Sequence, residues 1–397
     1  MAEPTSRPLA ASNAATASRP IIWLIGFFAF LNVYSLQAVL PMVMQDFHAT
    51  PVQAGLAVGA TVLAVGLVSP FMGMLSDSLG RKNILCTSLL FMTAPTALIP
   101  MVHSFEWLIA LRFMQGLAVP GIVVVLIAYI SEEFAAQGLA RMMSTYVGGT
   151  IMGGFSGRFI TGHAGDVLGW RGAFFTLAAM NLLGALVVIW RLPASRNFVA
   201  HRDFLGALRT LRLHLSNTRL MAACAVGFCV LFSLVGAFTY VNLYLAGSPF
   251  HLSSAGLANV FAVYLVGVFV TPLAARSIDR LGYMRALQWG LAVSASGLLL
   301  TLLPALACVI AGLAICSTGV FLCQSATISG IAKNVTEGRS LATGIYYLSY
   351  YAGGATGSWL AGIAFESHGW GGSVAVIALF QAIAASIVTV VWGRART

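Results

Sequence analysis

Long apolar segments alternate with short polar ones over almost the whole chain. About 20 apolar residues are needed for an α-helix to cross a bilayer, and twelve segments reach or approach that length. They lack the alternation of apolar and polar positions that membrane β-strands show. The pattern predicts an all-α integral membrane protein. The expected spans are residues 21–44, 53–76, 84–102, 106–130, 142–163, 171–190, 219–245, 254–276, 285–303, 306–331, 340–364 and 371–391.

The composition agrees with burial in lipid. Hydrophobic residues make up 59% of the chain and charged residues only 8%, whereas soluble domains carry about 25% charged residues. The net charge of +10 would suggest a nucleic-acid partner in a soluble protein. In a membrane protein it reflects the Lys and Arg that gather in cytoplasmic loops, so no nucleic-acid partner is expected.

The basic residues predict the orientation. If the N-terminus is cytoplasmic, only Arg112, Arg158 and Arg171 of the 21 Lys and Arg residues fall outside the cytoplasmic segments. This bias predicts that both termini are cytoplasmic.

The polar segments divide the chain into five parts. Residues 1–20, rich in Ala, Ser, Thr and Pro, predict a disordered cytoplasmic tail. A cytoplasmic linker at 191–218 carries Leu208 and Leu211 at helical spacing, which predicts an amphipathic helix on the membrane surface. The linker separates two six-helix bundles, at 21–190 and 219–392, and a short cytoplasmic tail follows at 393–397.

The two halves repeat each other. Seven positions match at an offset of 200, from Gly153 and Gly154 through Gly172 in the first half to Gly353 and Gly354 through Gly372 in the second. The match predicts two pseudo-symmetric bundles in the same sense, an organisation found among transporters.

The stretch "GMLSDSLGRK" follows the second span. Gly73 would let a neighbouring helix approach, Asp77 would sit against the positive end of a helix, and Gly80 would allow a tight turn before Arg81. The stretch resembles the signature of the major facilitator superfamily, G-x-L-x-D-x-x-G-R-K. The resemblance implies the fold of that family, twelve helices in two bundles, and transport of a small molecule by alternating access across a bacterial inner membrane.

In that family this loop is a conformational latch. The resemblance therefore implies latch roles for Gly73, Asp77, Gly80 and Arg81, and a carboxylate such as Glu132 as the partner of Arg81. The second half keeps Asp279 and Gly282 but lacks the basic pair, so its latch should be weaker. The residues to which the resemblance assigns a latch role are Gly73, Asp77, Gly80, Arg81, Glu132, Asp279 and Gly282.

Two arginines lie inside predicted spans. Arg112 and Gln115 fit the family's helix-4 pattern R-x-x-Q-G, which implies a place near the substrate path. Arg158 ends a glycine-rich stretch similar to a degenerate form of the helix-5 motif of drug/proton antiporters, which implies an efflux permease branch. Each arginine could instead reach the headgroups. For Arg158 the sharper hypothesis is a pair with Asp46 or Glu106.

No acidic residue falls in the middle of a span. A proton carrier needs a group whose pKa can be moved into the working range, and Asp46 and Glu106, near span ends, are the candidates. The neutral polar residues would line the path. The predicted substrate path comprises Asn32, Gln37, Arg112, Gln115, Arg158, Tyr240, Asn242, Tyr347 and Tyr350.

Three hypotheses follow for function. The first is proton-coupled export of a small organic molecule by a monomer. The second is transport of an organic anion, because Arg112 and Arg158 have no intramembrane acid to neutralise them. The third, which has little support, is a membrane sensor that does not transport. The sequence shows no metal-ligand spacing, no phosphate-binding loop and no nucleophile–base set, so no metal, cofactor or enzyme activity is expected.

Overall fold

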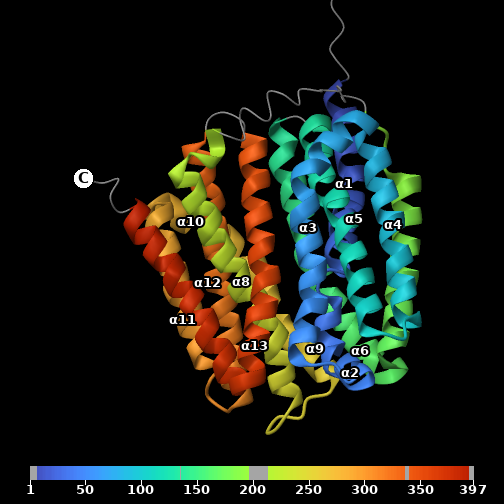
Figure 1. The fold of residues 1–397 in the computed structure, drawn as a ribbon. Helices are drawn as coiled ribbons and strands as arrows, with labels where there is room; N and C mark the ends of the chain where they lie inside the picture. The colour runs from blue at the N-terminus through green and yellow to red at the C-terminus, as the bar shows by residue number, and fades with distance from the viewer. Residues whose placement is uncertain (1–6, 135, 196–212, 336–338, 393–397) are drawn as a thin grey trace, which may run out of the picture.

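The computed structural model describes residues 7–134, 136–195, 213–335 and 339–392, and the regular structure within these ranges is entirely helical. Two groups of helices pack side by side, α1 to α6 in one and α8 to α13 in the other (Figure 1). The first described helix begins, and the last described helix ends, on the same side of the molecule (Figure 1). We call that side the termini end and the opposite side, which carries α2, the far end.

The first bundle begins with a helix that is broken. Its elements are α1 (Arg7–Leu31), the 3-10 segment η1 (Ser35–Val39), α2 (Leu40–Phe47), α3 (Pro51–Leu79), α4 (Arg81–Leu98), η2 (Ile99–Met101), α5 (Phe105–Glu133) and α6 (Ala136–Arg191). The long α6 bends at Gly169, so it crosses the bundle twice. The bundle therefore contains six spans within the described residues.

The second bundle repeats this plan, but its 3-10 segment lies in the second span rather than in the first. Its elements are α8 (Thr218–Ala246), α9 (Ser254–Val260), the 3-10 segment η3 (Phe261–Leu265), α10 (Val266–Leu281), α11 (Tyr283–Leu300), α12 (Leu306–Asn334), α13 (Arg339–Ile387) and the π-helical η4 (Val388–Trp392). The long α13 bends at His368 and Gly369. Six spans again result from the described residues.

Length and hydropathy agree with membrane insertion. Among the described residues, seven helices are long and apolar enough to cross a bilayer, and the broken pair of Arg19–Leu31 and Ser35–Phe47 makes an eighth. Two of the seven, Arg141–Arg191 and Leu341–Val391, each have 51 residues, which is enough for two crossings at about 1.5 Å per residue. The predicted all-α fold of twelve membrane-spanning helices in two bundles is confirmed.

The break in the first span has a local cause. Pro41 lies in the first turn of α2, where a missing N–H costs nothing. In an unbroken helix its ring would clash with the carbonyl of Gln37, four residues earlier. The chain therefore tightens into η1 just before the proline, and 3-10 segments inside longer helices often mark functional hinges.

The turn after the second span in each half requires glycine. Gly80 has φ +89° and Gly282 has φ +78°, values that side chains with a Cβ rarely adopt. Both glycines end one helix and begin the next, as the sequence predicts for Gly80. The structure does not show the close approach predicted at Gly73, because a Cβ there would meet no atom of the described residues within 4 Å.

Two of the matched glycines, Gly157 of α6 and Gly357 of α13, pack inside their own bundles. A Cβ on Gly157 would overlap the carbonyl oxygen of Leu31 on α1, and a Cβ on Gly357 would overlap that of Phe232 on α8. The glycines at which α3 crosses to the other bundle are different ones. A Cβ on Gly59 would overlap the hydroxyl of Ser358 on α13.

The N-terminal segment differs from the prediction of a disordered tail. Residues from Arg7 to Pro20 continue α1 as helix, and the many alanines of this stretch explain it, since Ala has the highest helix propensity. Most of the predicted amphipathic helix of the linker, and all of the tail at 393–397, lie outside the described residues.

Candidate functional site

A cavity of about 330 Å³ lies between the two bundles. Both bundles contribute walls: α1, α3, α5 and α6 on one side, and α8, η3, α12 and α13 on the other. Six tyrosines dominate the polar part of the lining: Tyr34, Tyr146, Tyr264, Tyr347, Tyr350 and Tyr351. Convergent polar groups in a mostly apolar hollow are typical of a ligand site.

The exposure of the lining residues rises toward the termini end of the cavity. At its deep end Arg158 is fully buried, with 0% exposure. Val147 and Ile328, which line it nearer the termini end, are each 38% exposed. The rise in exposure gives the direction from which a ligand can enter.

Arg158 is fixed at the deep end with one nitrogen left over. Its Nε donates to Gln37 Oε1 at 2.8 Å and its Nη1 donates to Gly154 O at 2.6 Å. Nη2 has no hydrogen-bond partner in the part of the chain that the structure describes. The guanidinium carbon lies 4.6, 4.7 and 4.5 Å from the ring centroids of Tyr34, Phe261 and Tyr264, so aromatic faces supply part of its stabilisation.

No carboxylate offsets this charge. Among the described residues that line the cavity, Arg158 is the only charged one. The hypothesis that Arg158 pairs with Asp46 or Glu106 is wrong. Asp46 instead accepts hydrogen bonds from Arg171 and Trp170 at the far end, and Glu106 is exposed in the first turn of α5.

Arg112 is equally buried but lies in a packed network. Its Nη1 donates to Asn32 O at 2.8 Å and to Gln115 Oε1 at 2.7 Å, and its Nη2 donates to Val33 O at 2.6 Å. Its Nε reaches Ala57 O at 3.4 Å. The carbonyls of Asn32 and Val33 lie at the break in the first span, where regular helical bonding is interrupted, so Arg112 helps to compensate for the break. Arg112 does not line the cavity.

The other residues predicted for the substrate path fall in three places. Tyr347 and Tyr350 line the cavity, and Gln37 lies behind Arg158. Asn32 and Gln115 belong to the Arg112 network, where Asn32 also bonds Asn181 at 2.9 Å. Tyr240 and Asn242 lie farther along α8, outside the lining. Sequence reasoning missed Tyr34, Tyr146 and Tyr351, for which the only available signal was tyrosine inside an apolar span.

The far end is closed by contacts between the bundles. The Tyr240 hydroxyl donates to Ser358 O and lies 3.1 Å from Pro51 O. The Val52 N–H donates to Glu366 at 3.0 Å. A separate bond joins Ser253 to Asp166 at 2.7 Å. The cavity is therefore accessible from the termini end and sealed at the far end.

The predicted latch lies at the termini end of the first bundle. Arg81 pairs with Glu132, with Nη2 2.6 Å from Oε1, and its Nη1 donates to the Ser76 hydroxyl. The pairing implied by the resemblance is thus present. The side chains of Asp77 and Asp279 lie outside what the structure describes.

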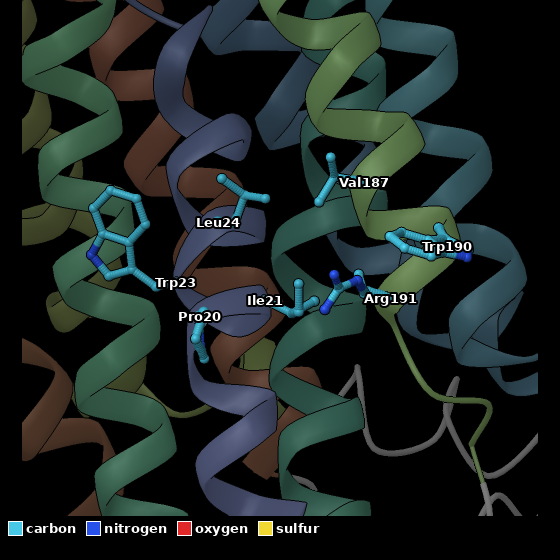
Figure 2. Close-up of a pocket in the computed structure, with 7 residues that line it drawn as sticks. All are labelled: Pro20, Ile21, Trp23, Leu24, Val187, Trp190 and Arg191. Carbon is cyan, nitrogen blue, oxygen red and sulfur yellow. The ribbon is translucent and has the colours of Figure 1, made fainter.

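A second hollow, of about 600 Å³, is not the better candidate. It lies between the α1 side chains Pro20, Ile21, Trp23 and Leu24 and the last turns of α6 (Figure 2). Its only charged lining residue is Arg191, which extends toward Ile21 (Figure 2). Its walls belong to one bundle and are almost wholly apolar. Of these two hollows among the described residues, the central cavity is the one in which polar groups converge.

Comparison with known proteins agrees with this architecture. A family model described as Major Facilitator Superfamily matches residues 22–339. The inner membrane transport protein YnfM of Escherichia coli (strain K12) is 33% identical over 92% of this chain and 88% of its own length. The uncharacterized MFS-type transporter YybF of Bacillus subtilis (strain 168) is 29% identical over 90% of this chain and 89% of its own.

Solved structures show the same fold. A bacterial homolog of the human lysosomal transporter Spinster, in an inward-facing and unoccupied conformation, superposes with a TM-score of 0.77. The superposition covers 97% of each chain at 16% identity, so this likeness concerns the fold alone.

Proposed function

The chain belongs to the major facilitator superfamily and is a multi-pass membrane transporter, and we propose that its substrate is a small organic anion held in the central cavity by Arg158. Alternating access would expose this cavity first to one side of the membrane and then to the other. Transporters of this family are not enzymes, so function rests on binding and conformational change.

One observation carries the proposal. Arg158 is fully buried and lines a cavity without a described carboxylate, yet its Nη2 has no hydrogen-bond partner among the described residues. An arginine inside a membrane is costly unless a partner or a water-filled cavity compensates it. An anionic ligand supplies that partner, and guanidinium binds carboxylates or phosphates with paired, charge-assisted hydrogen bonds.

The size and lining of the cavity narrow the substrate further. A volume of about 330 Å³ lies at the small end of the roughly 300–1,000 Å³ that ligand sites span. The tyrosine rings around Arg158, among them Tyr347 and Tyr350, offer stacking faces next to the charge. We expect a small acid with a planar or aromatic body.

The location follows from the basic residues. Arg81, Arg191 and Arg219 lie in helix ends at the termini end, and basic residues mark the cytoplasmic side. We propose that the termini are cytoplasmic, that the protein resides in a bacterial inner membrane, and that the cavity faces the cytoplasm in this structure. We propose a monomer as the transporting unit, because one chain contains both cavity walls.

Proton-coupled export is the energy source and direction that we propose for this transport. Asp46 and Glu106 stay the candidate proton carriers, although neither lines the cavity. The latch role of Gly73, Asp77, Gly80, Arg81 and Glu132, with Asp279 and Gly282 in the second half, also remains a proposal. The Arg81–Glu132 pair supports it, because this pair joins the start of α4 to the end of α5.

Benzoate and benzamide provide a direct test of the anion proposal. They have nearly the same shape, but only benzoate is charged. We expect isothermal titration calorimetry on the purified full chain to show benzoate binding and little binding of benzamide. In proteoliposomes, benzoate flux should exceed that of empty vesicles. Equal binding of the two probes, or none of benzoate, would contradict the proposal.

Two leucine variants separate the site from general charge effects. Arg158→Leu should weaken benzoate binding at least tenfold. Arg171→Leu removes the same charge from a pair that is about 40% exposed, with 41% and 39% for its side chains, and should leave binding unchanged. Equal losses in both variants would show that net charge, rather than the cavity, attracts the anion.

Coupling is tested separately by collapsing the pH gradient across the vesicle membrane. If export is proton-coupled, benzoate flux against its own gradient should stop, and Asp46→Asn or Glu106→Gln should reproduce that loss. Undiminished accumulation without a pH gradient would remove protons from the proposal and leave the anion site intact.

A further inference from the structure

Gln37 connects the cavity to the contact between the bundles. Its side chain is fully buried in η1, at the break of the first span. Its Oε1 accepts a hydrogen bond from Arg158 Nε at 2.8 Å, and its Nε2 donates to Thr239 Oγ1 at 3.0 Å. Thr239 is a fully buried residue of α8, in the second bundle. One amide therefore bridges the cation of the cavity and the opposite bundle.

The chemistry of the two neighbours determines the direction of this bridge. A guanidinium can only donate hydrogen bonds, so Gln37 must present its carbonyl to Arg158. Its NH₂ group then points to Thr239, whose hydroxyl can accept. If Arg158 turned away, the amide would lose the neighbour that orients it.

Arg158 lies between the two 3-10 segments, one from each bundle. On one side are Tyr34, which immediately precedes η1, and Gln37 in the middle of η1. On the other side are Phe261 and Tyr264 of η3. If the bundles separate at the far end, η3 would move away from Arg158 and Thr239 away from Gln37. The surroundings of the guanidinium therefore differ between the closed and the open far end.

A ligand can shift a conformational equilibrium only by the difference in its affinity for the two states. An anion on Nη2 interacts with an arginine whose pose depends on Gln37, and Gln37 is held in place by Thr239 only while the far end is closed. By linkage, closure favours binding and binding favours closure.

We propose that Gln37 is a positioning residue that transmits occupancy of the Arg158 site to closure of the far end. The proposal rests on the proposed function, because it requires an anion at Arg158. It adds which residue carries the coupling and in which direction the equilibrium moves: a bound anion stabilises the closed far end.

A cysteine at position 254 reports on the far end. Ser254 is 6% exposed, and its backbone packs against Gly162 of the other bundle, so Ser254→Cys should react with a membrane-impermeant maleimide only when the far end opens. The partly exposed Cys86 and Cys308 are replaced by alanine in this background. We expect saturating benzoate to slow the labelling several-fold.

Two variants test the two ends of the bridge. Gln37→Leu removes both hydrogen bonds, whereas Thr239→Val removes only the one between the bundles. Each should raise the labelling rate without ligand by about three- to twentyfold, the range expected for one interhelical hydrogen bond in a membrane. Each should also abolish the effect of benzoate on labelling.

A matched control and a conservative variant distinguish coupling from general loosening. Thr327→Val deletes an equally buried hydroxyl that bonds only within its own helix, to Cys323 O at 2.7 Å, and should label like the parent. Gln37→Glu can still accept from Arg158, and the Thr239 hydroxyl can donate to it. It should keep slow labelling while weakening benzoate binding, because its carboxylate neutralises Arg158.

The outcomes separate this inference from the proposed function. Parental labelling rates in both Gln37→Leu and Thr239→Val, with benzoate still effective, would overturn the role of Gln37 even if Arg158→Leu has lost benzoate binding. Failure of the unaltered chain to bind benzoate would instead overturn the anion site, and the coupling with it.

Discussion

Two arginines of the first bundle, Arg112 and Arg158, are both fully buried, yet their surroundings differ. All three nitrogens of Arg112 donate to protein oxygens, among them the backbone carbonyls of Asn32 and Val33 at the break in the first span. Arg158 lines a cavity and uses two nitrogens, while the third has no partner among the described residues. The difference teaches that burial of a charge alone does not identify a site. An unused donor in a cavity points to a ligand, whereas a complete set of bonds points to the scaffold.

The largest expected effect concerns Arg112. Arg112→Leu leaves the carbonyl of Val33 and the side-chain oxygen of Gln115 without the donor that Arg112 supplies, and each unsatisfied buried group costs about 1–3 kcal/mol. We expect the free energy of unfolding to fall by about 3 kcal/mol or more, measured by denaturant unfolding in detergent. Arg171→Leu serves as the control and should change it by about 0–1 kcal/mol. An unchanged free energy of unfolding in Arg112→Leu would contradict the scaffold role that distinguishes Arg112 from Arg158.

Arg158 should show the reverse behaviour. Arg158→Leu should reduce benzoate affinity about 10- to 100-fold, equivalent to about 1.5–3 kcal/mol for hydrogen bonds to a charged group. Its free energy of unfolding should stay within about 1 kcal/mol of the parent, because removal of an unpaired buried charge offsets the lost bonds. Calorimetric titration and the same unfolding assay measure both quantities. A large loss of stability with normal binding would assign Arg158 to the scaffold.

Two glutamines sharpen the comparison at intermediate size. Gln115 belongs to the Arg112 network, where its amide also donates to Thr96 at 2.8 Å, whereas Gln324 lines the cavity. Gln115→Leu should lower the free energy of unfolding by about 1–2 kcal/mol without changing benzoate affinity. Gln324→Leu should leave stability unchanged. If the two variants behaved alike in unfolding, the scaffold network would be less specific than its geometry indicates.

The smallest expected effect lies in the aromatic faces around Arg158. Tyr264→Leu removes a ring whose centroid is 4.5 Å from the guanidinium carbon, a contact worth about 0.5–1 kcal/mol. We expect benzoate to bind about two- to fivefold more weakly, whereas Tyr264→Phe keeps the ring and should bind like the parent. Loss in both variants would mean that the hydroxyl, rather than the face, matters.

The repeat and the lengths of the apolar segments were enough to predict the fold. The offset of 200 residues correctly pairs the bends at Gly169 and Gly369, and the predicted gap between 163 and 171 contains the first of them. The break at η1 was missed because residues 32–39 contain no glycine or proline. Its signal was Pro41, which acts on the preceding turn.

The candidate site was only partly predictable. Tyr347, Tyr350 and Arg158 were named from the sequence and meet in the cavity. Which residues surround Arg158 was not predicted, because this depends on how each helix is rotated about its own axis. Span lengths do not determine that rotation. Asp46 lies near the end of α2, where it pairs with Arg171 rather than with Arg158. The contribution of η3 was likewise hidden, since it comes from the other bundle.

The break in the first span also has an evolutionary consequence. Within a few residues it serves both arginines, through the carbonyls of Asn32 and Val33 for Arg112 and through the amide of Gln37 for Arg158. The residues at positions 37 and 158 should therefore covary among related sequences. The carbonyls are insensitive to side-chain identity, so position 33 should drift freely while position 112 stays arginine. One short segment would thus carry two different patterns of inherited constraint.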